Sequence, residues 1–167
     1  MPAEQHQPLN AAELGMLRRG GPIPLIGLLT AVTRWIEQRH LEQLALAGFP
    51  EIRRAHTPVV VHLSSGGMRL TDLADAAGIS KQAMAELVDD LEAQGYLERT
   101  PDPTDGRAKL LMMTDRARAA HAATLQIFAD IEAELAVAVG VAALEQVRNT
   151  LGDILHSVVL DAQQQGP

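Results

Sequence analysis

Two short clusters of polar side chains have chemistry that suits the recognition of nucleic acid. The first cluster is Ser80, Lys81 and Gln82, which follow a Gly-Ile turn. A serine and a glutamine can each donate to and accept from the edges of bases, and a lysine can reach a phosphate or a guanine. The second cluster is Asp105, Arg107 and Lys109, and Lys109 is the only lysine of the chain besides Lys81. The two lysines therefore direct attention to the middle of the sequence.

Residues that could support catalysis or bind a metal ion are scattered. The chain has no cysteine, which excludes disulfides, thiolate metal sites and a cysteine nucleophile. The acidic pairs Asp89-Asp90 and Glu132/Glu134 fall on helix faces without a partner base, and we interpret them as solvated surface. We therefore expect no enzyme, no catalytic residue, no metal site and no cofactor. No two of the histidines considered as metal ligands have the HxxxH spacing that places two ligands on one helical face. These histidines are His40, His56, His62 and His121.

Composition places the chain among folded domains. Its 167 residues suffice for one domain or for a domain with a dimerisation arm, and 47% are hydrophobic, so it can bury a core. The net charge of −7 argues mildly against nucleic acid, although the placement of the basic groups decides more than their total. No apolar run reaches the roughly 20 residues of a membrane span, and the first residues lack the features of a signal peptide. We expect a cytoplasmic protein without membrane contact.

The elements that position the two clusters can be read from the spacing of apolar residues. Helices are predicted over 70–78 and 80–95, with Ser80 as the cap of the second helix. The connection is too short for an antiparallel hairpin, so the second helix crosses the first steeply and offers its first turn to the outside. The pattern then changes to two short strands, 96–100 and 108–113, around the turn-forming sequence PDPTDG.

Long amphipathic helices flank this central part. Apolar residues recur three and four apart in the helix before it and in the two helices after it. Their apolar faces exceed what the central part can cover. A two-fold dimer would bury them, and a monomer with an apolar stripe left over is the alternative. We divide the chain into a flexible N-terminus with room for a short helix (1–21), an N-terminal dimerisation helix (22–50), a central module (51–113) and C-terminal dimerisation helices (114–167).

The central sequence resembles a known family. The stretch LTDLADAAGISKQAMAELVDDLEAQGYLERTPDPTDGRAKLLMMTDRARA is similar to the winged-helix region of MarR-type transcriptional regulators, most densely over residues 69–119. Its most specific part is DPTDGRAK, which spans 102–109. The resemblance implies a mainly α fold with a small β-hairpin wing, a winged helix-turn-helix core and helical dimerisation arms at both ends. It also implies a homodimer that binds a palindromic operator in double-stranded DNA. Such a regulator is expected to be a repressor that a small aromatic or phenolic effector releases.

The resemblance also assigns roles to individual residues. The turn from Ser80 to Ala83 corresponds to the part that enters the major groove. Arg107 corresponds to the wing arginine that enters the minor groove, and Asp105 to the acid that orients it. Arg69 and Arg99 are placed for phosphate contacts. The expected DNA-binding residues are Arg69, Ser80, Lys81, Gln82, Ala83, Arg99, Asp105, Arg107 and Lys109.

An effector site is expected near the first arm. Trp35 and Arg39 lie on that helix, and His62 lies on a short helix beside its junction with the central module. These residues could line a pocket for an aromatic ligand. Equally, the tryptophan could belong to the core, and the histidine could be a satisfied polar group.

One departure from the family pattern concerns charge. Many relatives have arginines on the recognition helix where this chain has Glu86 and Asp90, and acidic residues outnumber basic ones over 52–116. If Glu86 faces the phosphates of DNA, it lowers the affinity for DNA. If it lies one helical turn too far along the helix to reach them, it orients neighbouring arginine or lysine side chains instead. We expect moderate, strongly salt-sensitive DNA binding. The acidic balance supports an alternative, a winged-helix dimer that acts as a protein-interaction module with little DNA affinity.

Overall fold

The computed structural model describes residues 23–160, with side chains up to residue 157. The chain divides into two compact units, Met1–Ile127 and Phe128–Pro167. The N-terminal segment 1–21, with its room for a short helix, lies outside the described residues, as does the end of the C-terminal segment 114–167. Among the helices that the structure describes, none combines the length and the apolar character needed to cross a membrane.

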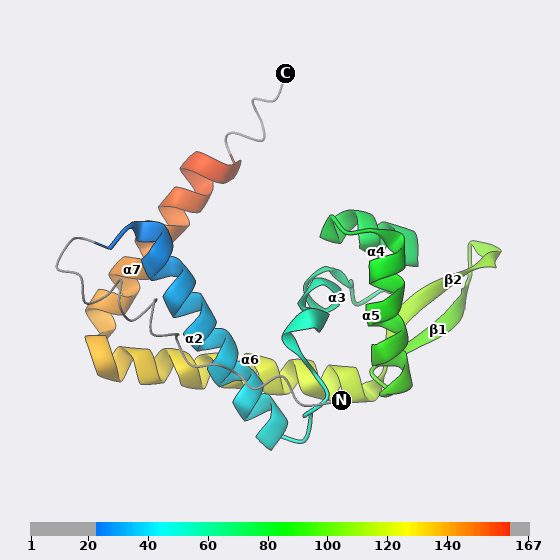
Figure 1. Ribbon diagram of the computed structural model, residues 1–167, viewed down its shortest axis with the longest axis horizontal. Helices are drawn as coiled ribbons and strands as arrows, with labels where there is room; N and C mark the ends of the chain where they lie inside the picture. The colour runs from blue at the N-terminus through cyan, green and yellow to red at the C-terminus, as the bar shows by residue number, and fades with distance from the viewer. Residues whose placement is uncertain (1–22, 161–167) are drawn as a thin grey trace. The chain divides into compact units, whose positions relative to one another are not determined.

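The described part of the first unit contains a long helix, a winged-helix module and the first half of another long helix (Figure 1). The second unit contains the rest of that helix and the helix after it. The elements are α2 (Leu25–Leu46), η1 (Arg54–His56), α3 (Thr57–His62), α4 (Leu70–Ala77), α5 (Lys81–Ala93), β1 (Leu97–Asp102), β2 (Asp105–Met113), α6 (Asp115–Val139), α7 (Val141–Ile154) and the π-helical turn η2 (Leu155–Leu160). The predicted mainly α fold with one small β-hairpin is confirmed.

The core of the first unit lies between α3, α4, α5 and the hairpin. The apolar residues whose spacing predicts α4 and α5 face this core, since Leu73, Met84 and Val88 are completely buried. Ile79, in the turn between these helices, packs against the same core. Aliphatic side chains dominate it, as the shortage of aromatic residues predicts. The buried members are Val59, Leu73, Ala74, Met84, Val88, Leu91, Tyr96, Leu97, Leu111 and Ala120.

The two strands form an antiparallel hairpin that extends past α5, and we call this hairpin the wing (Figure 1). It is longer than predicted, because Pro101 pairs with Lys109 and Asp102 pairs with Asp105 across a register shift. The prediction that the whole of PDPTDG forms the turn between the strands is therefore wrong, because its first two and last two residues belong to the strands. Proline is tolerated in β1 because this strand forms the edge of the sheet.

The chain before α4 reaches the other side of the wing. Met68 exchanges two backbone hydrogen bonds with Leu111, at 3.2 and 2.8 Å. The preceding residue, Gly67, has a φ of 83°, and a Cβ there would lie 3.0 Å from the backbone oxygen of Leu111. Glycine is therefore required for this close approach. The contact ties the base of the wing to the start of α4.

Apolar side chains are exposed along the long helices. On α2, Leu25, Ile26 and Val32 are 58%, 72% and 50% exposed, and only Leu44 is buried. In the second unit, α7 has no buried residue, although Val147, Leu151 and Ile154 form one apolar stripe that continues to Leu155 at the start of η2. The predicted amphipathic stripes exist, and within the single chain they stay largely in contact with solvent.

Candidate nucleic-acid interface

The turn between α4 and α5 has the backbone geometry that its sequence predicts. Gly78 adopts the left-handed conformation, with φ 65° and ψ 27°, and its N–H donates to the carbonyl oxygens of Ala74 and Asp75 at the end of α4. Only glycine adopts this conformation at low cost. Ser80 then begins the next helix, and its Oγ accepts a hydrogen bond from the N–H of Ala83 at 3.2 Å. The serine is thus the helix cap, and its hydroxyl hydrogen is the part left to donate elsewhere.

The first turn of α5 presents polar side chains outward. We call Ser80–Ala83 the recognition turn; all four residues are exposed, while Met84 directly after them is buried. Within the described range, Lys81 and Gln82 have no side-chain hydrogen bond or ion pair. The buried face of α5 therefore fixes the helix, and the opposite face is left for another molecule.

The base of the wing is held by a buried carboxylate. Asp102 is 6% exposed and accepts hydrogen bonds from the hydroxyl of Thr104 at 2.7 Å and from its N–H at 2.8 Å. Arg69 adds two more, from Nε at 2.8 Å and Nη2 at 2.6 Å. The bonds from Thr104, followed by those from Arg69, lower the pKa of Asp102 to about 2. The same contact raises the pKa of Arg69.

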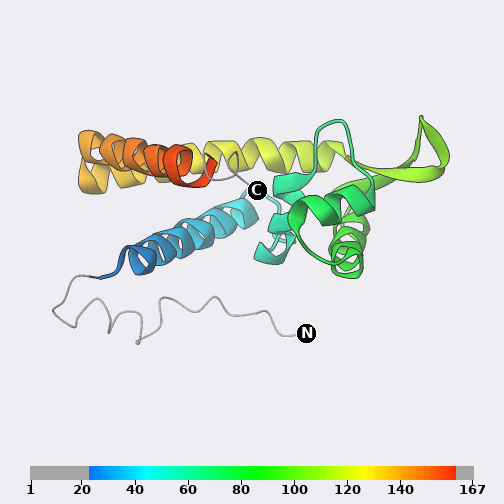
Figure 2. The same ribbon diagram turned by 90° about the horizontal axis from the view of Figure 1, so that it is seen from above.

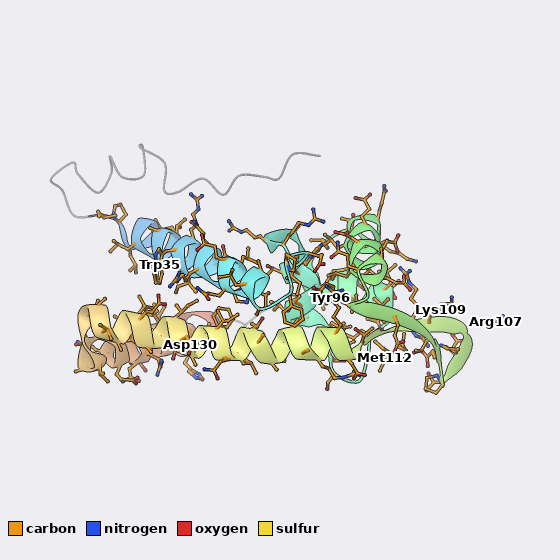
Figure 3. All side chains as sticks on the ribbon, turned by 90° about the horizontal axis from the view of Figure 1, so that it is seen from below. Trp35, Tyr96, Arg107, Lys109, Met112 and Asp130 are labelled. Atoms are coloured by element: carbon orange, nitrogen blue, oxygen red, sulfur yellow. The ribbon has the colours of Figure 1, made fainter. Side chains whose placement is uncertain are left out.

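Two basic side chains project from the wing. Arg107 and Lys109 are exposed on β2, beyond the base of the hairpin where Tyr96 and Met112 lie (Figure 3). Asp105, expected to orient the guanidinium of Arg107, accepts instead from its main-chain N–H at 3.1 Å. The other oxygen of Asp105 lies 3.7 Å from Nη2 of Arg69. Asp105 therefore shapes the turn of the wing, and in the described structure the guanidinium of Arg107 has no partner.

Arg99 is largely neutralised by α5. Its guanidinium donates to Asp89 at 2.7 Å and to Glu92, and its side chain is 27% exposed. Sequence reasoning placed Asp89 in solvent and did not pair it with Arg99. The pair joins β1 to the recognition helix, so part of the charge of Arg99 is already balanced inside the chain.

A buried histidine anchors α5 from the other side. His56 is completely buried, and its Nε2 lies 2.9 Å from a carboxylate oxygen of Asp90, which Arg53 also contacts. Its Nδ1 accepts the N–H of Arg53 at 3.2 Å, so Nε2 carries the hydrogen and donates. Burial alone would raise the pKa of Asp90, but the hydrogen bonds from His56 and Arg53 outweigh it and lower that pKa. The interpretation of Asp90 as solvated surface was wrong.

The ion pairs sort the basic residues into two groups. Arg53, Arg54, Arg69, Arg99, Arg116, Arg118 and Arg148 each have a carboxylate partner. Over residues 23–157, Lys81, Arg107 and Lys109 have no such partner and no other side-chain hydrogen bond. We call these three the free cations. All belong to the recognition turn or the wing, and the sequence singled out all three.

The residues considered for an effector site lie on two helices. Trp35 is 41% exposed on α2, with Arg39 one turn further along the same helix, and His62 is exposed on α3. Nearby on α2, burial lowers the pKa of His40, whose Nε2 lies 3.0 Å from the hydroxyl of Thr124 on α6. Across the described residues, no three histidine, aspartate or glutamate side chains gather as metal ligands.

The start of α6 is joined to the module by a second cluster that sequence reasoning missed. Tyr96 donates to Glu51 at 2.9 Å, and Arg116 pairs with the same carboxylate at 2.8 Å. The guanidinium of Arg116 lies over the ring of Tyr96, 4.6 Å from its centroid. Thr114 caps α6, accepting the N–H of Ala117 at 3.2 Å. The helix that leaves the wing is therefore fixed to the module at its first turn.

Comparison with known proteins agrees with this geometry. Residues 52–108 match the family model of the MarR family. Among curated proteins, none matches the chain.

Solved structures show the same fold. A transcriptional regulator from Thermotoga maritima is 23% identical, with 86% of this chain and 99% of that chain covered and a TM-score of 0.63. The reduced form of MarR from E. coli is 21% identical, with coverage of 81% and 99% and a TM-score of 0.68. A mutant of MepR from S. aureus, bound to an oligodeoxyribonucleotide, is 21% identical, with coverage of 78% and 95% and a TM-score of 0.57. The resemblance to MarR-type winged helix-turn-helix regulators is confirmed.

Proposed function

We propose that this chain, with its MarR-type winged-helix module, is a sequence-specific DNA-binding transcriptional regulator that acts as a homodimer. The observation that carries the proposal is the position of the free cations. The other arginines with assigned partners are balanced by carboxylates, whereas Lys81, Arg107 and Lys109 are available to a polyanion. Affinity for DNA depends on local positive charge more than on the net charge of the chain.

The recognition turn would enter the major groove. Gln82 and the hydroxyl of Ser80 would contact base edges, Ala83 would allow close approach, and Lys81 would reach a phosphate or a guanine. Although Ser80 already accepts from Ala83, its O–H could still donate to a base and its second lone pair could still accept. The hydroxyl of Ser80 would therefore cap α5 and contact DNA at the same time.

The wing would reach the neighbouring minor groove. Arg107 would insert its guanidinium between the phosphate walls, and Lys109 would contact a phosphate. Asp105 would hold the turn through the main chain of Arg107. Arg69 and Arg99 would contribute only the guanidinium N–H groups that their carboxylates leave over. These are the N–H groups of Nη1 of Arg69, that of Nε of Arg99, and the second N–H of each Nη atom that is already bonded.

A second copy of the chain would cover the exposed apolar faces. Two exposed faces are too apolar for a surface that stays in water. They are formed by Leu25, Ile26 and Val32 on α2 and by Leu151 on α7 with Leu155 at the start of η2. A two-fold dimer repeats the same patch on both chains and closes the assembly. It would also present two recognition turns to the half-sites of a palindrome about one helical turn apart.

Regulation would act through the arrangement of the two modules. A small aromatic or phenolic effector, held by Trp35 and Arg39 on α2 with His62 on α3, would change the spacing of the recognition turns. The two turns would then no longer match successive grooves, and repression would be relieved. The partly exposed indole of Trp35 supports this site, because it offers a flat apolar face. Such a regulator would act in the cytoplasm.

A DNA titration tests the proposal. A labelled duplex from the region upstream of the chain's own gene, and a scrambled duplex of equal length, are titrated at two salt concentrations by fluorescence anisotropy. Tighter binding to the upstream duplex, weakened by salt, is expected. Absence of binding to both duplexes at low salt would refute the proposal and favour a protein-interaction module.

A further inference from the structure

The outer face of α5 continues beyond the recognition turn. Gln82 and Glu86 lie four residues apart, so they are neighbours on one face of the helix. Both are exposed, while Met84, Val88 and Leu91 on the other side are buried. A partner that contacts Gln82 therefore meets the carboxylate of Glu86 next.

Glu86 differs from the other acidic residues of α5. Asp89 and Glu92 pair with Arg99, and Asp90 is bonded to His56 and Arg53. Glu86 has no hydrogen bond or ion pair within the described range. The idea that it orients basic neighbours is therefore unsupported, because Lys81, the closest free cation along α5, has no partner either.

A bare carboxylate on a face that meets DNA is unfavourable unless a donor satisfies it. Phosphates offer no donor and repel the charge. The edges of bases in the major groove do offer donors, namely the amino groups of cytosine and adenine. Adenine places the acceptor N7 beside its amino group, where it opposes the second carboxylate oxygen. Cytosine places a C–H there, and guanine and thymine present acceptors, so cytosine fits best.

We propose that Glu86 determines specificity by accepting a hydrogen bond from N4 of a cytosine in each half-site. This inference rests on the proposed DNA-binding function and extends it to one base. The carboxylate would then select against other bases more than it adds affinity, because it repels every site that lacks the amino group. At this one position, the acidic side chain of α5 would therefore contribute to the recognition of a base.

Selection from a randomised duplex pool tests this role. The wild type, Glu86→Gln and Asp153→Asn are used as full-length proteins, and the enriched sequences are compared. Asp153 is exposed on α7, on the side away from Leu151 and Leu155, and its variant changes the net charge equally. The wild type should enrich cytosine at one position per half-site, with a preference of about tenfold. Glu86→Gln should move that preference to adenine, because a glutamine bonds both N6 and N7.

The outcomes separate this inference from the proposed function. Glu86→Gln should also bind scrambled DNA more tightly, while Asp153→Asn should match the wild type in motif and affinity. If Glu86→Gln enriches the same motif as the wild type and only binds all DNA more tightly, the role in reading cytosine is wrong and the proposed function stands. If the wild type enriches no sequence and binds no duplex, both proposals fall together.

Discussion

Arg69 donates two hydrogen bonds to a single carboxylate oxygen of Asp102, from Nε at 2.8 Å and from Nη2 at 2.6 Å. The pair joins the residue before α4 to the last residue of β1. It therefore fixes the direction of the wing relative to the helix-turn-helix. The exposed Arg107 depends on this support, because a guanidinium can enter a groove only if the hairpin that bears it keeps one orientation.

Stability should depend on acid through Asp102. Its pKa is lowered from 3.8 to about 2, chiefly by the hydrogen bonds from Thr104. A carboxyl whose pKa is lower in the folded state stabilises the fold above its unfolded pKa and loses that contribution as the pH falls. Between about pH 4 and about pH 2, the free energy of unfolding of the wild type should fall more steeply than that of Asp102→Asn. Urea unfolding at several pH values measures the difference, and parallel curves would contradict the assignment.

Removal of the buried histidine should destabilise the module. His56→Ala removes the acceptor for the N–H of Arg53 and one donor to Asp90, which keeps the bonds from Arg53 and Gln94. We expect a loss of about 1–3 kcal/mol in the free energy of unfolding. His62→Ala, on the exposed end of α3, serves as the control and should change it by less than about 0.5 kcal/mol. If urea titrations give the same free energy of unfolding for the two variants, the hydrogen bonds of His56 do not stabilise the module.

The apolar stripe of α7 should control assembly. Leu151→Glu places a charge on that stripe, where Leu151 is 39% exposed in the single chain. Sedimentation equilibrium should show a dimer for the wild type and a monomer for the variant. Gln146→Glu adds the same charge away from the stripe and should remain dimeric. A wild type that sediments as a monomer at micromolar concentration would argue against the proposed dimer.

Local features of the fold could be predicted from the sequence, because they depend on neighbouring residues. The left-handed Gly78, the cap at Ser80 and the buried face of α5 each follow from the residues within one or two turns. The free cations could also be identified, since two of them are the only lysines of the chain.

Partners that are distant in the sequence could not be predicted. His56 and Asp90 are 34 residues apart, and Arg69 and Asp102 are 33 apart. Composition and periodicity indicate that such residues are polar, but not which of several carboxylates each one meets. For the same reason, Arg99 could be proposed as a DNA contact without any sign that Asp89 and Glu92 neutralise it. These pairings exist only once the helices have packed.

The salt dependence of DNA binding by the wild type, Arg107→Ala and Arg148→Ala tests the central claim most directly. Arg148 is paired with Glu132 and Glu145, so its variant controls for the loss of one positive charge. Plots of log affinity against log salt should be shallower by about 0.9 for Arg107→Ala than for the wild type, with weaker binding throughout. Arg148→Ala should keep the wild-type slope. A slope for Arg107→Ala equal to that of the wild type would show that the free cations do not contact DNA.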